Sequence, residues 1–165
     1  MLGSQYSYRL MAIDGTLFHV PDTKANAAAF GRSSNQYGPG AYPQVKCVLL
    51  AECGSHAVVG LHMDRYDVSE VHGAYRLLCQ IGADMLLLLD AGLISGAFIE
   101  QVRERSAHVL GAVEAGVWEQ PRKARRLRDG SVLAWVEPSH GGRYRQQRGM
   151  WVRIISYCVT DARLG

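Results

Sequence analysis

Residues 8–20 constrain the fold of this chain most strongly, because two apolar runs meet there around a single carboxylate. The segment reads Tyr-Arg-Leu-Met-Ala-Ile-Asp-Gly-Thr-Leu-Phe-His-Val. Alternation of large apolar residues with small or polar ones over four to eight positions predicts β-strands. The dipeptide Asp14-Gly15 favours a tight turn. The segment therefore predicts a first β-hairpin with Asp14 at its turn.

Asp14 is also the first candidate site residue. A carboxylate at a strand end, beside a glycine that lets a ligand approach closely, suits a hard cation or a phosphate. A turn without any ligand accounts equally well for the same two residues. The pattern by itself leaves both interpretations open.

Asp90 is the second candidate site residue. Residues 85–90 read Met-Leu-Leu-Leu-Leu-Asp, a continuous apolar run that is typical of a strand covered on both faces, and Ala91-Gly92 follow. Two carboxylates at the ends of core strands, each near a glycine, suit Mg²⁺ or Mn²⁺, which can pair with substrate phosphate in such sites.

The remaining pattern predicts an α/β order of elements. A second hairpin is expected where residues 45–53 and 57–63 flank Gly54-Ser55-His56. Residues 32–43 are rich in Gly, Ser, Asn and Pro and predict an exposed loop. Capping residues and apolar spacing predict helices over residues 24–30, 70–81 and 96–106, and a further strand over residues 108–113.

The last quarter of the chain is strongly basic and predicts a polyanion partner. Residues 122–165 contain 10 Lys/Arg and 3 Asp/Glu, whereas residues 1–121 contain 8 and 12. A solvated basic face without a partner fits the same charge pattern. An Asp129-Gly130 turn between strands, and a strand at residues 150–159, predict that this region is all β. Its candidate phosphate contacts are Arg122, Lys123, Arg125, Arg126, Arg128, Arg143, Arg145 and Arg148.

Several classes of protein are disfavoured by composition. No basic segment followed by an apolar one opens the chain, so no secretory signal is expected. The longest apolar segment, residues 85–99, is interrupted and shorter than the roughly 20 residues of a membrane span. We therefore expect a soluble, cytoplasmic protein without membrane contact. None of the four cysteines forms a C-x-x-C pair, and all lie in apolar runs, which predicts buried, reduced thiols at Cys47, Cys53, Cys79 and Cys158.

The histidines do not suggest a metal site. His19 and His62 lie in expected strands and His72 lies in an expected helix. We find no cysteine or carboxylate at ligand spacing from them, and we therefore interpret none as a metal ligand.

Residues 11–17, Met-Ala-Ile-Asp-Gly-Thr-Leu, resemble the first motif of the haloacid dehalogenase-like phosphatases. In that family the nucleophile is the first aspartate of an Asp-x-Asp pair. Ala12 occupies the matching position, and an alanine cannot form an aspartyl-phosphate. Phosphatase chemistry of that kind is therefore not expected.

A resemblance of wider extent covers nearly the whole chain. The spaced motifs resemble the catalytic domain of DDE transposases from bacterial insertion sequences, of the insertion-sequence-four type. The resemblance implies a ribonuclease H-like mixed sheet with flanking helices over residues 1–115, and a basic β-rich insertion over residues 116–165. The matching segments are Asp14-Gly-Thr, Pro21-Asp-Thr, Asn26, Phe30-Gly31, Tyr42-Pro43-Gln44, the strand at Ala57-Val58, Ser69-Glu70 and residues 86–93.

The same resemblance implies a chemistry. Asp14 and Asp90 take the places of the first and second metal-binding carboxylates, with Mg²⁺ or Mn²⁺ as cofactor. The implied reaction is cleavage of a DNA phosphodiester by water, followed by attack of the freed 3′-hydroxyl on target DNA. Partners would be transposon ends and target DNA at the bacterial nucleoid, with a second copy of the chain as a further candidate.

Two departures from the family pattern bear on activity. Ala91-Gly92-Leu93 stand where the family usually has an arginine followed by Gly-Phe or Gly-Tyr. The third catalytic residue, a glutamate in a Tyr-x₂-Arg-x₃-Glu-x₆-Lys helix, has no counterpart here, and we interpret Glu70 and Glu114 as capping or surface carboxylates.

Two hypotheses follow from the absence of the third catalytic glutamate. The chain is expected to be a fragment of a catalytic domain, with one face of its sheet uncovered. The alternative is an inactive remnant that acts at most as a DNA-binding or dimerising module.

Overall fold

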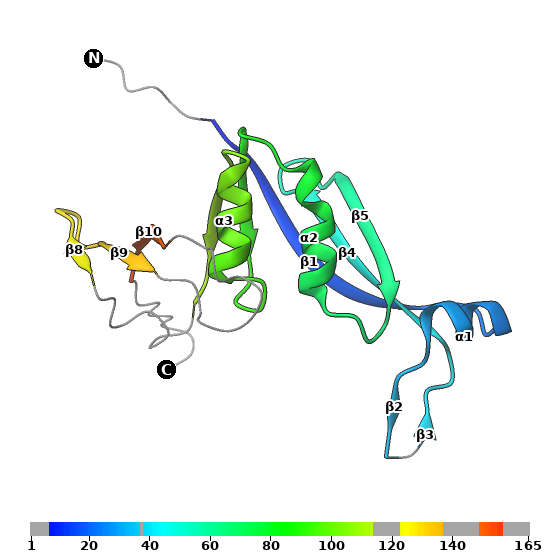
Figure 1. Cartoon of the computed structure of the whole chain (residues 1–165). Coiled ribbons are helices and arrows are strands. Elements are labelled where there is room, and N and C mark those ends of the chain that lie inside the picture. The colour runs from blue at the N-terminus through cyan, green and yellow to red at the C-terminus, as the bar shows by residue number, and fades with distance from the viewer. Residues whose placement is uncertain (1–6, 37, 114–122, 137–148, 157–165) are drawn as a thin grey trace, which may run out of the picture. The chain divides into compact units, whose positions relative to one another are not determined.

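The computed structural model describes residues 7–36, 38–113, 123–136 and 149–156. The chain divides into two compact units, Met1–Val113 and Glu114–Gly165, and each is described by itself (Figure 1). Within the described residues, no helix is long and apolar enough to cross a membrane.

The first unit is a mixed α/β fold built on a five-stranded sheet. The strand order is β5-β4-β1-β6-β7, with β1 in the centre. β4 runs antiparallel to both β1 and β5, whereas β6 runs parallel to both β1 and β7. The predicted second hairpin is confirmed as β4 and β5. The bounds are Arg9–His19 for β1, Gln44–Glu52 for β4, Val58–Arg65 for β5, Met85–Leu89 for β6 and His108–Gly111 for β7.

The predicted turn at Asp14-Gly15 is wrong, because β1 passes through both residues without a break. Its pairing with β4 continues from Met11 opposite Glu52 to His19 opposite Gln44, with Gly15 opposite Val48. An unbroken antiparallel partner satisfies the backbone groups that a turn would have left unpaired. The two apolar runs are thus one long strand.

Gly15 has a packing role in this strand. A Cβ atom at this position would lie 2.4 Å from both Cγ and Cδ of Glu70. The absence of a side chain therefore makes room for Glu70, which belongs to the helix above the sheet.

Two helices pack on one face of the sheet. They are α2, Glu70–Leu77, which continues into a 3₁₀ turn η1 at Leu78–Gln80, and α3, Gly96–Glu104. Figure 1 shows them side by side in front of the strands. The rings of Tyr75 and Phe98 meet edge to face between them, with centroids 5.2 Å apart. Ser69 and Ser95 cap the two helices through their side-chain oxygens, as the sequence predicts.

The predicted short helix is also present, as α1, Lys24–Phe30, with Thr23 as its N-cap and Gly31 at its end. The loop that follows contains a two-residue strand pair, β2 at Ser34–Asn35 and β3 at Gly38–Pro39.

The main core lies between the sheet and the helices α2 and α3. Met11, Leu87 and Val102 are fully buried in it. The opposite face is different, and the expectation that β6 is covered on both faces is wrong for the described residues. Leu86 and Leu88 remain half-exposed there, since neither α2 nor α3 reaches that face. Exposed apolar side chains on that face are Leu10, Val59, Leu61, Met63 and Leu110.

The second unit contains a three-stranded antiparallel sheet in the order β10-β9-β8. Its strands are β8, Ala124–Arg126, β9, Val132–Val136, and β10, Met150–Ile154. The predicted turn at Asp129-Gly130 is confirmed between β8 and β9, with Gly130 at φ 85°. Trp135 and Trp151 face each other across β9 and β10, with ring centroids 5.5 Å apart. The end of the strand predicted over residues 150–159 lies outside the described residues.

We expect Gly73→Ala to destabilise the first unit by about 1–2 kcal/mol. A Cβ atom at Gly73 would lie 2.4 Å from Cγ2 of Val48, a stiff β-branched side chain in β4. Overpacking costs about 1–3 kcal/mol, and contact with a stiff side chain corresponds to the upper part of that range, about 2–3 kcal/mol. The better helix propensity of alanine offsets about 1 kcal/mol of it. Urea unfolding followed by circular dichroism at 222 nm measures the difference.

Gly54→Ala is the matched control for this substitution, since no atom lies within 4 Å of the added Cβ. It should change the unfolding free energy by no more than about 0.5 kcal/mol. Equal stability of Gly73→Ala and the native chain would show that α2 does not need this close approach to β4.

Candidate functional site

The register of the parallel pair β1 and β6 brings the two candidate aspartates to the same level of the sheet. Paired residues run from Arg9 beside Met85 to Ala12 beside Leu88. Continued by two residues, the same register aligns Asp14 with Asp90, which directly follows β6. Neighbouring strands lie about 4.8 Å apart, so a register continued in this way would bring Asp14 and Asp90 close to each other. Both residues are exposed.

Asp14 belongs to the face of the sheet that α2 and α3 leave uncovered. Met11 and Ile13 are buried in the core beneath the helices. Because side chains alternate along a strand, Asp14 lies on the opposite face. Leu87 and Leu89 are likewise buried, and Asp90 follows directly after them at the end of β6.

One oxygen of each carboxylate is held by the backbone. Oδ1 of Asp14 accepts the N–H of Gly15 at 2.8 Å, and Oδ1 of Asp90 accepts the N–H of Leu93 at 3.1 Å. Among the described residues, neither Oδ2 atom has a hydrogen-bond partner. Two oriented carboxylates with free oxygens are a donor set that fits Mg²⁺ or Mn²⁺, which bind one or two carboxylates and keep several waters.

Glu70 does not join this pair. Its side chain lies over Gly15 on the helix-covered face, and its Oε1 is 3.8 Å from Nζ of Lys46. Since Gly15 and Asp14 face opposite sides of the sheet, the carboxylates of Glu70 and Asp14 are separated by the sheet itself. The interpretation of Glu70 as a helix-end carboxylate agrees with this placement. Glu114 lies outside the described residues.

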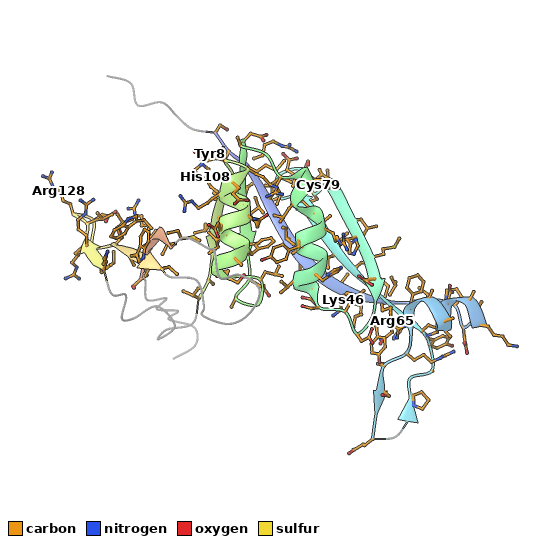
Figure 2. All side chains as sticks on the ribbon, viewed as in Figure 1. Tyr8, Lys46, Arg65, Cys79, His108 and Arg128 are labelled. Carbon is orange, nitrogen blue, oxygen red and sulfur yellow. The ribbon has the colours of Figure 1, made fainter. Side chains whose placement is uncertain are left out.

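Half of the predicted phosphate contacts lie in the described part of the second unit. Lys123, Arg125, Arg126 and Arg128 are all exposed, on and beside the edge strand β8, and Figure 2 labels Arg128. Arg122, Arg143, Arg145 and Arg148 lie outside the described residues. The exposed cations leave β8 with a basic surface.

Arg153 is a further cation of this unit, and it is engaged internally. Its guanidinium forms an ion pair with Asp129 and its Nε donates to Oγ of Ser131 at 3.0 Å. Asp129 also accepts the Ser131 hydroxyl at 2.6 Å and the Ser131 N–H at 3.1 Å. The hydrogen bonds from Ser131, followed by the Arg153 charge, lower the pKa of Asp129. This network fixes the turn that joins β8 to β9.

The cysteines partly follow the sequence-based prediction. Cys47, Cys53 and Cys79 are free thiols, but only Cys47 is buried, and that burial raises its pKa. Cys79 is exposed in the 3₁₀ turn (Figure 2), so its predicted burial is wrong. Cys158 lies outside the described residues.

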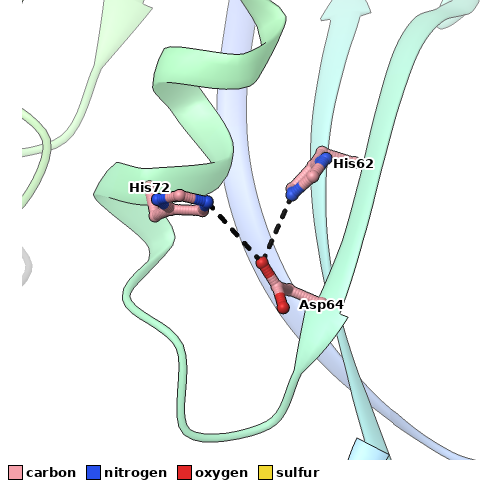
Figure 3. A group of neighbouring side chains, drawn as sticks. All are labelled: His62, Asp64 and His72. Carbon is pink, nitrogen blue, oxygen red and sulfur yellow. Dashed lines mark hydrogen bonds and ion pairs between the residues drawn. The ribbon is translucent and has the colours of Figure 1, made fainter. Parts of the chain in front are cut away.

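Sequence reasoning missed a cluster of His62, Asp64 and His72. Nε2 of His62 lies 3.4 Å from Oδ2 of Asp64, and Nε2 of His72 lies 3.9 Å from the same oxygen (Figure 3). The prediction that no carboxylate lies at ligand spacing from the histidines is therefore wrong, because Asp64 does. The spacing His62-x-Asp64 in a strand places both side chains on one face, and this signal was available in the sequence.

Comparison with known proteins finds similarity in both sequence and structure. A profile described as the transposase DDE domain matches residues 5–154. Transposase InsG for insertion sequence element IS4, from Escherichia coli K12, is 30% identical over 156 residues. The match covers 94% of this chain and 35% of InsG, so the chain spans about a third of that curated relative. A piggyBac transposase in a synaptic complex with hairpin DNA matches with a TM-score of 0.48 and 12% identity, over 94% of this chain and 35% of the other.

Acidification is expected to loosen the turn between β8 and β9 below the usual pKa of an aspartate. Folding lowers the pKa of Asp129. The ionised carboxylate therefore stabilises the turn fully above the pKa of about 3.9 that an aspartate has in the unfolded chain. That stabilisation is lost as the pH falls through the lower pKa of the folded state. The amide resonance of Ser131, followed by NMR between pH 7 and pH 2, should report this loss.

Asp129→Asn should remove that titration, whereas Asp84→Asn in the first unit should leave it unchanged. An identical titration of Ser131 in the native chain and in Asp129→Asn would contradict the assignment to Asp129.

Proposed function

The chain belongs to the transposase DDE domain family, and we propose that it contributes Asp14 and Asp90 as two metal-binding carboxylates of a catalytic core for DNA transposition. The family match confirms the resemblance to DDE transposases of the insertion-sequence-four type. The observation that carries the proposal is the parallel register of β1 and β6, which supports a common level for Asp14 in β1 and Asp90 just after β6.

The sheet supports a ribonuclease H-like interpretation of the fold. Three antiparallel strands, β5, β4 and β1, are followed in space by two strands parallel to β1, and helices connect the parallel strands. We propose that residues 1–115 form this core and that residues 116–165 are a β-rich insertion.

The family implies dependence on a divalent metal, and we propose that Asp14 and Asp90 hold Mg²⁺ or Mn²⁺. When bound, such an ion lowers the pKa of a coordinated water and neutralises charge on a phosphodiester. The chain's own contribution is to fix the two carboxylates. The N–H groups of Gly15 and Leu93 hold one oxygen of each, and the exposed face leaves the other oxygen accessible to a DNA strand.

A third carboxylate is required for the full reaction, and we propose that it comes from residues outside this sequence. The chain spans 35% of the length of InsG. Glu70, the acidic residue of the first turn of α2, lies on the other face of the sheet. The uncovered apolar face beside Asp14 offers a surface on which a further helix could pack. Without that helix and its carboxylate, we propose that the 165-residue chain binds DNA or dimerises at most, and does not catalyse the reaction.

We propose that the basic second unit binds the DNA backbone. Exposed cations on an edge strand contact phosphates without reading bases, so they position the substrate rather than select its sequence. The reaction class is then cleavage of a DNA phosphodiester by water, followed by transfer of the 3′-hydroxyl end to target DNA.

Asp14→Asn and Asp90→Asn should each weaken Mn²⁺ binding by at least about tenfold, because each removes one of two charged ligands while keeping side-chain size. Electron paramagnetic resonance of free Mn²⁺ measures the affinity of the 165-residue chain. In a longer protein that supplies the third carboxylate, the same variants should abolish DNA cleavage and strand transfer.

Glu70→Gln is the matched control for these variants, since it neutralises a neighbouring carboxylate on the opposite face. It should leave Mn²⁺ affinity unchanged. Undiminished strand transfer by Asp14→Asn would remove the catalytic role of this residue.

DNA affinity should fall steeply as salt rises from 50 to 200 mM, as expected for phosphate contacts. Each of Lys123→Ala, Arg125→Ala, Arg126→Ala and Arg128→Ala should reduce the slope of log affinity against log salt by about 1 if its cation contacts a phosphate. Fluorescence anisotropy with a labelled duplex gives these slopes. Arg103→Ala, an exposed cation of α3, is the control and should leave the slope unchanged. An affinity independent of salt would contradict the assignment.

A further inference from the structure

Three potential metal ligands meet where β5 packs against α2. His62 and Asp64 are two residues apart in β5, so both side chains point to the face that α2 covers. His72 belongs to the first turns of α2 and reaches down toward them, as Figure 3 shows. One ligand atom from each of the three residues lies within 4.8 Å of the others.

The distances from each histidine to Asp64 are close to those of a tetrahedral metal site. Zn²⁺ binds imidazole nitrogen and carboxylate oxygen at about 2.0–2.1 Å, which separates neighbouring ligands in a tetrahedron by about 3.4 Å. The separation between Nε2 of His62 and Oδ2 of Asp64 is 3.4 Å, and that between Nε2 of His72 and the same oxygen is 3.9 Å. A shift of about 0.5 Å by His72, on an exposed helix surface, would bring its ring to the ideal separation from Asp64.

The carboxylate is oriented before any metal arrives. Oδ1 of Asp64 accepts the backbone N–H of Arg65 at 2.9 Å, which turns Oδ2 toward both histidines. Outer hydrogen bonds of this kind are typical of metal-binding carboxylates. The side chains of His62 and Asp64 are 27% and 30% exposed, so a water can complete the coordination.

One neighbouring side chain competes with a metal for His72. Nε of Arg76 lies 3.4 Å from Nε2 of His72 and donates to it. Arg76 is an exposed side chain one helical turn away, and it can swing into solvent when a cation takes its place.

We propose that His62, Asp64 and His72 form a site for a transition metal of the Zn²⁺ class, with water in the fourth position. Two imidazoles and one carboxylate favour such an ion over Mg²⁺, which prefers oxygen ligands alone. The site lies on the helix-covered face, whereas Asp14 lies on the other, so the inference does not depend on the proposed function.

Such an ion would tie the edge strand β5 to the start of α2. The same end of α2 carries Glu70, whose side chain packs over Gly15 in the central strand. The metal would therefore have a structural role: it would stabilise α2 against the sheet by binding the folded state.

Isothermal titration of the 165-residue chain with Zn²⁺ tests the proposal, and Co²⁺ absorption identifies the ligands. We expect one site per chain, and a rise in melting temperature of about 5–10 °C at a metal concentration a hundredfold above Kd. His62→Gln, Asp64→Asn and His72→Gln should each weaken Zn²⁺ binding at least about tenfold. Circular dichroism checks that each variant is folded, and His72→Gln, on an exposed position, is the variant least able to disturb the core.

Two controls separate this site from other metal binding. His56→Asn removes an exposed histidine from the β4–β5 turn, and asparagine tolerates its φ of 60°. Asp84→Asn removes an exposed carboxylate that belongs to neither group of proposed ligands. Both variants should bind Zn²⁺ as tightly as the native chain.

Three results would overturn the proposal. One is the absence of a Zn²⁺ site in the native chain. Another is equal affinity in the native chain and in His72→Gln. The third is an intense sulfur-to-cobalt charge-transfer band, which would assign the ion to the cysteines, whereas nitrogen and oxygen ligands produce only weak visible bands.

Discussion

The continuous backbone pairing of β1 is the interaction on which the rest of the first unit depends. β1 pairs along nine residues with β4 on one side and over a shorter stretch with β6 on the other. The antiparallel neighbour follows a connection that contains α1, β2 and β3, and the parallel one requires a crossover through α2. A turn at Asp14 would interrupt the pairing with β4, so this strand must run straight through a dipeptide that elsewhere favours a hairpin.

The helices depend on that sheet for their position, and small residues set how closely they approach it. Gly73 of α2 lies directly on Val48 of β4, and Gly15 of β1 leaves room for Glu70. Edge-to-face packing of Tyr75 and Phe98 then holds α2 against α3. Both helices thus bury one face of the sheet and leave Asp14 on the other.

Much of the secondary structure could be predicted from local sequence signals. Thr23, Ser69 and Ser95 cap helices because their side-chain oxygens satisfy free N–H groups a few residues away. The Asp129-Gly130 turn depends on a glycine with positive φ and on nearby hydrogen bonds. These are short-range interactions, so the residues that make them lie within a few positions of one another.

The failures arose where distant segments decide the outcome. Asp14-Gly15 is extended because β4, about 35 residues away, supplies its partners. The leucines of β6 suggest burial on two faces, yet the described helices cover only one. His72 approaches His62 and Asp64 only after α2 folds back onto β5, and no spacing within one element reveals that contact.

The two groups of potential metal ligands differ in chemistry as well as in face. Asp14 and Asp90 offer oxygen only, on an open surface where a bulky anionic polymer can reach them. His62, Asp64 and His72 offer nitrogen and oxygen between a strand and a helix. A hard cation that must exchange waters for phosphate suits the first group, and a borderline cation that stays in place suits the second. Because the sheet separates Asp14 from the histidine cluster, a metal bound at that cluster would not compete for the proposed catalytic carboxylate.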